Sequence, residues 1–236
     1  MPPAVCTGTA APGPSHRFDG RTDVRRGEPT DEVWPVVHAE RAALADDLEG
    51  LSPARWSTPS LCAAWDVHDV LAHLLATART TPLRFLRGLV AARFDFDAAN
   101  AAEVRDERRA DPADTLAAFR TVLTRTSGPP APRDTRLVEA FVHGADVRRP
   151  LGIPWAPPRA AVARALRFQV RSSDAVGGGR GRVAGVRLAA SDTDLVLGSG
   201  PVAEGPVLSL LLVAAGRRSA LADLTGPGVA VLAGRP

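Results

Sequence analysis

The chain has 236 residues, 45% of them hydrophobic and 23% charged, and carries a formal net charge of +3. This length suffices for one large core or two small ones, and the composition is ordinary for a soluble globular protein. All 29 basic residues are arginine, because the sequence contains no lysine. They are spread along the chain, mostly near acidic residues, and form no basic stripe, so we expect no nucleic-acid partner.

The cysteines and the hydropathy bear on the compartment. Two cysteines, Cys6 and Cys62, are too few for a disulfide framework, which favours a reducing setting. The N-terminus lacks the basic and apolar segments of a secretory signal. The longest apolar run, residues 207–215, is far too short to span a bilayer. We therefore expect a cytoplasmic protein with no membrane partner.

The N-terminal third begins without a pattern and then becomes helical. Residues 1–30 are rich in proline, glycine, threonine and charge, and we predict a disordered lead there. Apolar residues at helical spacing predict a first helix over residues 33–51. Asp66 and Asp69 predict the capped start of a second helix, which ends before Pro82.

The middle of the chain is also largely helical. Two apolar stretches, residues 83–90 and 116–123, flank a charged segment whose form the sequence leaves open. The second stretch predicts a helix with Pro112 in its first turn. After a proline-rich break, a further helix is predicted over residues 134–149, stopped by Pro150 and Gly152.

Beyond a proline-rich linker the pattern changes. It predicts a helix over residues 159–172, short strands near residues 183–188 and 195–197, a buried helix over residues 207–215 and a final strand at residues 229–232.

These elements predict two folded domains. The first is an all-helical bundle over residues 31–153. The second is a small α/β domain with a mostly antiparallel sheet over residues 154–236. The residues that point to chemistry lie mainly in the bundle.

Glu139 and His143 lie four residues apart on the helix predicted over residues 134–149, so both side chains project from one face. Leu137 and Phe141 give that face apolar surroundings. A buried carboxylate and imidazole are costly unless something binds them, and a divalent metal can bind both. The spacing alone also fits an intrahelical hydrogen bond, which is the commoner outcome for an isolated pair.

His73 supplies a further candidate ligand. It sits in the second predicted helix, where a lone histidine is more often a satisfied core residue. Helical bundles, however, build metal sites from inward side chains on facing helices, and two histidines with one carboxylate leave coordination positions open, as catalytic sites do. We therefore predict a site of His73, Glu139 and His143, with Asp146 orienting His143 and His38 as the reserve ligand.

Residues 59–74 have the sequence Pro-Ser-Leu-Cys-Ala-Ala-Trp-Asp-Val-His-Asp-Val-Leu-Ala-His-Leu. A second set of residues, spaced along the later helix and its end, consists of Arg136, Glu139, His143, Asp146 and Gly152. These two motifs resemble the signatures of the mycothiol-dependent maleylpyruvate isomerase family. Residues 210–218, Leu-Leu-Leu-Val-Ala-Ala-Gly-Arg-Arg, are similar to the helix ending in Gly-Arg of that family's second domain.

The resemblance implies a DinB-like four-helix metalloprotein bundle followed by a sterol-carrier-like α/β domain. It assigns His73, Glu139 and His143 to a divalent metal, usually zinc, and implies mycothiol as the thiol cofactor. A metal with an open position can hold a thiol as the nucleophilic thiolate, which would add to a small electrophilic substrate in cis–trans isomerisation or S-transfer. Arg217, with Arg218 as the second choice, is expected to hold a substrate carboxylate.

Other conspicuous residues have simpler interpretations. Cys62 is expected to pack rather than react, and His68, in the first turn of its helix, is expected to be exposed. The glycine-rich run at residues 177–181 lacks the lysine and the strand–loop–helix context of a phosphate loop.

Two alternatives to an enzyme stay open. In one, the C-terminal domain binds a lipid or another small molecule without catalysis. In the other, the chain is a regulatory protein that binds a partner and whose metal is only structural.

Overall fold

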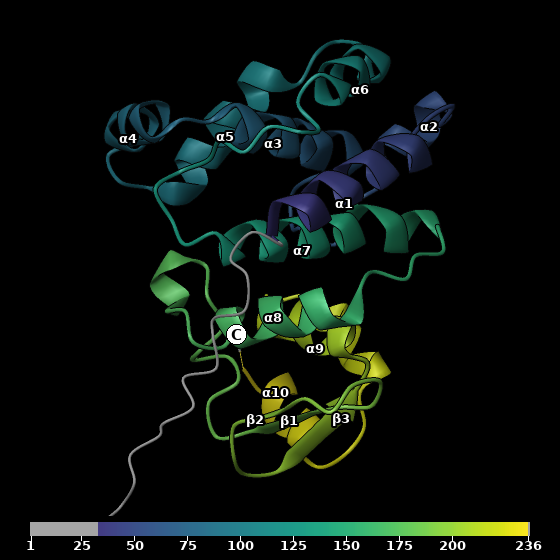
Figure 1. The fold of residues 1–236 in the computed structure, drawn as a ribbon, viewed down its shortest axis with the longest axis vertical. Helices are drawn as coiled ribbons and strands as arrows, with labels where there is room; N and C mark the ends of the chain where they lie inside the picture. The colour runs from purple at the N-terminus through teal and green to yellow at the C-terminus, as the bar shows by residue number, and fades with distance from the viewer. Residues whose placement is uncertain (1–32, 236) are drawn as a thin grey trace, which may run out of the picture. The chain divides into compact units, whose positions relative to one another are not determined.

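The computed structural model describes residues 33–235, apart from the side chains of residues 96 and 97 (Figure 1). The lead predicted over residues 1–30 and the cysteine at position 6 lie outside the described residues. In the part that is described, no helix combines the length and the apolar character needed to cross a bilayer.

From residue 33 to residue 169 the described chain is predominantly helical. The helices are α1 (Val33–Asp47), α2 (Pro53–Trp56), α3 (Val67–Arg79), α4 (Pro82–Ala91), α5 (Phe96–Glu107), α6 (Pro112–Arg120), α7 (Asp134–Leu151) and α8 (Arg159–Gln169). The charged segment whose form the sequence left open therefore contains α5. Pro150 lies inside α7 and does not end it; the helix ends at Gly152, the second predicted stop, whose φ of +65° is the left-handed C-cap conformation that glycine adopts easily.

The remaining elements surround a small sheet. They are η2 (Asp174–Val176), β1 (Arg187–Ala190), β2 (Val196–Leu197), β3 (Val202–Gly205), α9 (Val207–Ala214), η3 (Arg218–Asp223) and α10 (Gly228–Ala233). The strand predicted at residues 229–232 is wrong, because this segment is helix α10. The buried helix predicted from residue 207 is confirmed as α9.

The sheet is mixed, which corrects the prediction of a mostly antiparallel sheet. Its strand order is β2-β1-β3. The β1–β2 pair is antiparallel, whereas β1 and β3 are parallel over the longer register, from Arg187 opposite Val202 to Ala190 opposite Gly205. The chain crosses from one edge of β1 to the other through a short connection in which Gly198 and Gly200 have φ of +76° and +112°. These backbone conformations are open to glycine at little cost.

The start of α3 is fixed by the two aspartates expected to cap it. Asp66 accepts a hydrogen bond from the Asp69 backbone N–H at 2.8 Å, and Asp69 accepts one from the Asp66 backbone N–H at 3.2 Å. This reciprocal pair satisfies two backbone donors that have no intrahelical partner. Every residue of α3 except Asp69 and Arg79 is buried, so α3 is a central helix of the bundle.

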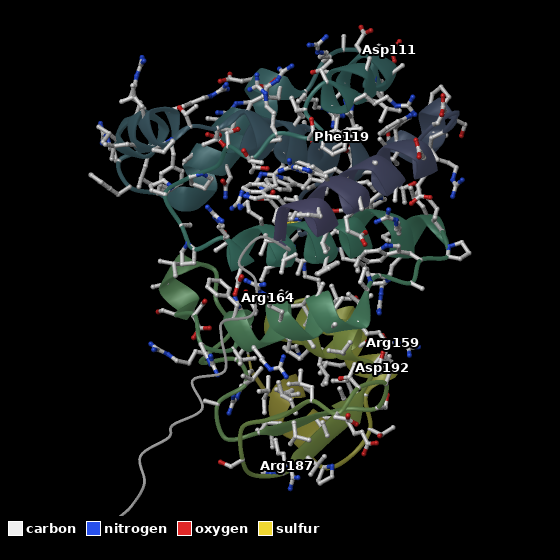
Figure 2. The ribbon with its side chains drawn as sticks, in the orientation of Figure 1. Asp111, Phe119, Arg159, Arg164, Arg187 and Asp192 are labelled. Atoms are coloured by element: carbon white, nitrogen blue, oxygen red, sulfur yellow. The ribbon has the colours of Figure 1, made fainter. Side chains whose placement is uncertain are left out.

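Helix α7 contributes to two hydrophobic clusters. Val147 and Leu151 pack with α3 and α6, in the cluster that contains the fully buried Phe119 labelled in Figure 2. Leu137 and Phe141 pack with α8, α9 and the sheet, in a cluster that also includes the start of α1. Figure 1 shows α7 between α1 and α8. Apolar packing is thus continuous through α7 and α8, and the division into domains at residue 153 stays a prediction.

Candidate active site

The candidate site lies where α3 faces α7. His73 is in the middle of α3, and Glu139 and His143 are one turn apart on α7. The imidazole rings of His73 and His143 lie 4.8 Å apart, centroid to centroid, in an edge-to-face arrangement. The Trp65 ring lies 5.0 Å from His73 and 6.4 Å from His143. Two helices that are remote in sequence therefore bring the two predicted histidines together beneath one tryptophan.

The loop before α3 is tied directly to α7. The backbone N–H of Leu61 donates to the carbonyl oxygen of Asp146 at 3.2 Å. Within the loop, the hydroxyl of Ser60 donates to the carbonyl oxygen of Trp65 at 2.8 Å. These bonds position Trp65 and the start of α3 against α7. They give the loop residues of the motif at residues 59–74 a structural role beside His73.

Glu139 is an ionised carboxylate surrounded by cationic groups. Its Oε1 accepts a hydrogen bond from Thr77 Oγ1 at 3.1 Å, and its Oε2 lies 2.9 Å from Arg136 Nη1. Burial by itself would raise the pKa of Glu139, but Arg136, His73 and Arg41 together outweigh it and lower the pKa. Thr77 is one turn beyond His73 on α3. Glu139 is therefore hydrogen-bonded to the helix that carries His73, another of the predicted ligands.

His73 is a neutral imidazole with an unsatisfied nitrogen. The residue is 7% exposed, and its Nδ1 has no hydrogen-bond partner. Burial, followed by the electrostatic effect of the neighbouring His143, lowers its pKa to about 3. A histidine must be neutral to bind a metal, and buried ring nitrogens are otherwise nearly always hydrogen-bonded. Its Nδ1 is therefore the group in α3 most in need of a partner.

His143 is oriented by a carboxylate that an arginine holds in turn. His143 Nδ1 lies 2.9 Å from Asp146 Oδ2, which accepts its proton when Nδ1 is the donor. Asp146 is fully buried and also accepts from Arg217 Nε at 2.9 Å and Nη2 at 2.6 Å. Burial alone would raise the pKa of Asp146, but these bonds from Arg217 and His143 lower it. The arrangement fixes one tautomer, in which Nε2 of His143 carries the lone pair.

Arg217 and Arg218 have different surroundings. Arg217 lies just before η3 and reaches back 71 residues to Asp146, and its Nη1 donates to the carbonyl oxygen of Ala215 at 2.8 Å. Arg218 instead donates to the backbone carbonyl oxygens of Ala233 and Arg235. Of the two arginines, Arg217 is the one beside the predicted ligands.

The donor chemistry suits a divalent ion, although the side chains are not arranged around one. Among residues 33–235, no group of three or more His, Cys, Asp and Glu side chains is arranged so that it could hold a metal. Three features still fit an ion: the partnerless Nδ1 of His73, the carboxylate that orients His143 and the ionised state of Glu139. Arg136 and Thr77 hold the carboxylate of Glu139, so binding a metal would require that carboxylate to change partners.

Several residues near the site were not predicted, or were predicted differently. Arg41 of α1 is only 3% exposed and contributes to the low pKa of Glu139, but no motif marks it. Thr77 is four residues after His73, a spacing that identifies it as a neighbour on the same helix face. His68 is not exposed as expected: it is 2% exposed, and its Nε2 lies 2.8 Å from Thr115 Oγ1, because α6 packs over the first turn of α3.

The remaining candidates lie around this site. Cys62 is half-buried in the loop before α3, and its charge when ionised would raise the pKa of Arg217, after the larger effects of burial and Asp146. His38, the reserve ligand, stacks on Trp34 with ring centroids 5.8 Å apart, and its Nε2 is buried without a hydrogen-bond partner.

Comparison with known domains supports the resemblance to the isomerase family. The family model described as the mycothiol maleylpyruvate isomerase N-terminal domain matches residues 37–148, a range that contains His73, Glu139 and His143. Residues 37–148 are similar to the N-terminal domain of this family. The resemblance inferred from the two motifs is therefore confirmed. No curated protein matches the chain significantly.

Solved structures of the family show the same fold. A crystal structure of the mycothiol-dependent maleylpyruvate isomerase has 15% sequence identity, with a TM-score of 0.57, and the alignment covers 85% of this chain and 93% of that one. A histidine-to-alanine mutant of the isomerase gives a TM-score of 0.56 with the same identity and coverage. The similarity extends beyond the matched family domain, so most of the chain shares the fold of the isomerase.

Proposed function

We propose that this protein is a mycothiol-dependent metalloenzyme that acts on a small electrophilic substrate, by cis–trans isomerisation or S-transfer. The observation that carries the proposal is the meeting of His73 with His143 across α3 and α7, at a centroid distance of 4.8 Å, beside Glu139, whose side chain is 10% exposed. His73, Glu139 and His143 are the proposed ligands of a divalent ion, with zinc as the first choice. When bound, such an ion supplies an open position that holds the thiol of mycothiol as its thiolate.

The protein groups around the proposed ligands have positioning roles. Asp146 accepts a hydrogen bond from His143 Nδ1–H and so directs the Nε2 lone pair of His143 to the site. Arg217 holds Asp146 through Nε and Nη2, which keeps that buried carboxylate ionised and fixed. Trp65 covers both imidazoles and limits the access of water to them.

Arg217 is also the proposed group for a substrate carboxylate. A guanidinium group has five N–H donors, and three of its N–H groups point to Asp146 and to the Ala215 carbonyl oxygen. The other two are sufficient to bind one carboxylate of the substrate. The same side chain would then join the substrate to the carboxylate that orients His143.

Metal content is the first measurement. We expect about one divalent ion per chain in the wild type and its loss in His73→Ala and in His143→Ala. His38→Ala is the matched control, since His38 is a second histidine with a buried, partnerless nitrogen, and it should keep the ion. Wild-type protein that remains metal-free after incubation with zinc would reject the proposal and favour small-molecule binding by the C-terminal region.

Activity then tests the thiol. Maleylpyruvate with mycothiol is the first substrate pair to assay, because the solved neighbours are named for this reaction. We expect turnover that requires mycothiol and that disappears in His143→Ala. Turnover of equal rate without any thiol would exclude the proposed role of mycothiol.

Arg217→Lys separates its two proposed roles. Loss of the support for Asp146 should lower metal affinity, by about 10–100-fold for a residue behind a ligand. Loss of the carboxylate contact should raise KM at saturating metal. A variant with unchanged metal affinity, KM and kcat would remove Arg217 from the site.

A further inference from the structure

Helix α4 presents large apolar side chains to solvent. None of its residues is buried, although the structure describes all of them. Leu83, Leu86 and Val90 of α4 and Phe94 just beyond it are 67%, 54%, 54% and 66% exposed. The spacing of Leu83, Leu86 and Val90 places these three residues on one side of the helix, and Phe94 lies in the turn that follows it. We call these four residues the α4 stripe.

Basic residues flank the stripe, and acidic residues are missing from this segment. Arg84, Arg87 and Arg93 are all exposed, and the sequence has no aspartate or glutamate between residues 80 and 94. Arg84 inclines toward α5, where its Nη2 lies 3.4 Å from Glu107 Oε1. The outer surface of α4 therefore combines an apolar stripe with net positive charge.

Phe94, just beyond the end of α4, is exposed although its backbone conformation is unfavourable for a bulky residue. The backbone N–H of Phe94 donates to the Leu89 carbonyl oxygen at 2.8 Å, and that of Arg93 donates to the Val90 carbonyl oxygen at 3.0 Å. This closure gives Arg93 and Phe94 positive φ angles of 54° and 66°, a conformation that helix ends usually assign to glycine. A bulky residue is unfavourable there, yet the Phe94 ring gains little burial in return.

Figure 1 shows α4 at the margin of the helical layer, next to α5. The α4–α5 groove between the two helices is lined by small residues such as Gly88 and Ala99, and by the charged side chains of Arg84, Arg87, Glu103, Arg105 and Asp106, with Leu83 at its edge. Phe85 and Leu89 are the partly buried large residues of α4, whereas Leu83, Leu86 and Val90 remain exposed. A contiguous apolar surface of this kind marks a binding site, whereas single scattered apolar residues on a surface need no explanation.

The charge decides between the possible occupants of this surface. Pairing of two α4 stripes in a dimer would bring the arginines of both copies together without a carboxylate from the same segment. An anionic lipid surface instead offers phosphates to the arginines and an apolar layer to the leucines and the phenylalanine. A helix with a basic flank and a Leu/Phe face is the pattern of segments that lie in the plane of a membrane.

We propose that α4 docks the protein peripherally on anionic lipid bilayers through the α4 stripe, with Arg87 and Arg93 contacting phosphate headgroups. Such docking lies in the plane of the bilayer and needs no spanning helix, but it departs from the expectation, drawn from the sequence, of no membrane partner. It uses none of the residues of the candidate active site, so it stands independently of the proposed function.

Flotation of the full-length protein with vesicles tests the proposal. We expect binding to vesicles of equal parts phosphatidylglycerol and phosphatidylcholine, and little binding to phosphatidylcholine alone. Leu83→Ser combined with Phe94→Ser should reduce the partition coefficient about 10-fold or more. Val176→Ser combined with Val196→Ser is the matched control, because these valines are 69% and 47% exposed on other elements, and it should bind as the wild type does.

The basic flank is tested separately. Arg87→Glu combined with Arg93→Glu should likewise reduce flotation strongly, whereas Arg187→Glu, on the sheet (Figure 2), should leave it unchanged. Binding of the wild type should weaken between about 0.05 M and about 0.5 M salt. Equal binding to neutral vesicles, or no flotation at all, would overturn the proposal. So would a dimer in solution that Leu83→Ser and Phe94→Ser dissociate without any vesicle binding by the wild type.

Discussion

Helices α3 and α4 follow one another in the chain, separated only by Thr80 and Thr81, but their surroundings are opposite. Almost every residue of α3 is buried, including three polar ones, whereas no residue of α4 is buried. Both helices carry large apolar residues at helical spacing, so apolar content alone does not distinguish them. What differs is the packing that other elements provide, since α5, α6 and α7 all contact α3 and only α5 makes extensive contact with α4.

This difference in packing determines which residues of each helix need an explanation. In α3 a buried polar group must find a partner, and His68 and Thr77 find Thr115 and Glu139. The nitrogen of His73 that does not find one is the feature that marks the candidate site. In α4 the reverse holds, because exposed apolar groups are the unexplained feature.

The largest expected difference is in core stability. Leu71→Ala, at a position in α3 that is fully buried, should lower the free energy of unfolding by about 2–5 kcal/mol. Leu86→Ala in α4 removes the same atoms at a position that is 54% exposed, and should change it by less than about 0.5 kcal/mol. Urea denaturation of both variants measures the contrast. Equal losses would show that α4 is covered in solution.

A second pair of substitutions should have opposite signs. A Cβ added at Gly144, next to His143 on α7, would lie 2.9 Å from Arg148 Nη1 and 3.2 Å from Trp155 Cη2. Arg148 is fixed there by Asp47 at 2.6 Å and by the Trp155 ring, so Gly144→Ala should destabilise the protein by about 1–3 kcal/mol.

Gly88→Ala on α4 is the counterpart of Gly144→Ala. The nearest atom to an added Cβ there is Glu103 Oε1, at 3.9 Å. Alanine therefore fits, and its helix propensity should stabilise the protein by up to about 1 kcal/mol. Thermal unfolding of the two variants checks both signs, and destabilisation by Gly88→Ala would mean that α4 packs more tightly than its exposure indicates.

The sequence predicts these helices better than it predicts what covers them. The capping aspartates and apolar spacing locate α3 correctly, and the turn-by-turn spacing of Glu139 and His143 places them on one face of α7. Such features are local in the chain. The burial of His68 and the approach of Arg41 to Glu139 depend on helices far away in the sequence, and no local pattern reports them.

The C-terminal region shows the same limit. Residues 229–232 are a short apolar run, which by itself fits a strand or a buried helix equally, and the structure has helix α10 there. The parallel pairing of β1 with β3 is non-local, and the four residues of β3 include a glycine and a glutamate that weaken a strand pattern. The sequence predicted that Asp146 orients His143. It did not predict that Arg217, expected to bind a substrate carboxylate, would donate hydrogen bonds to Asp146.

The smallest expected effect concerns the caps that begin the two helices. Asp66 caps α3 and also pairs with Arg108 Nη1 at 2.9 Å, while the neutral Thr81 hydroxyl caps α4. Burial by itself raises the pKa of Asp66, but Arg108 and the Asp69 backbone N–H outweigh it and hold the pKa below its ordinary value of 3.8. Because the folded pKa is depressed, the stabilisation is fully present above the unfolded pKa and is lost as pH falls through the folded one.

Asp66→Asn keeps a capping oxygen but removes the charge, so it isolates this contribution. At pH 7 we expect a loss of about 0.5–1 kcal/mol, since the pair with Arg108 is partly exposed. The difference from the wild type should shrink below the ordinary carboxyl pKa and vanish in stronger acid. Thr81→Ala should lower stability by an amount that does not depend on pH over the same range. Unfolding curves for the three proteins from pH 7 downward measure this. If Asp66→Asn were less stable than the wild type by the same amount at every pH, the charge of Asp66 would not stabilise α3. Both helices would then depend only on an uncharged capping hydrogen bond.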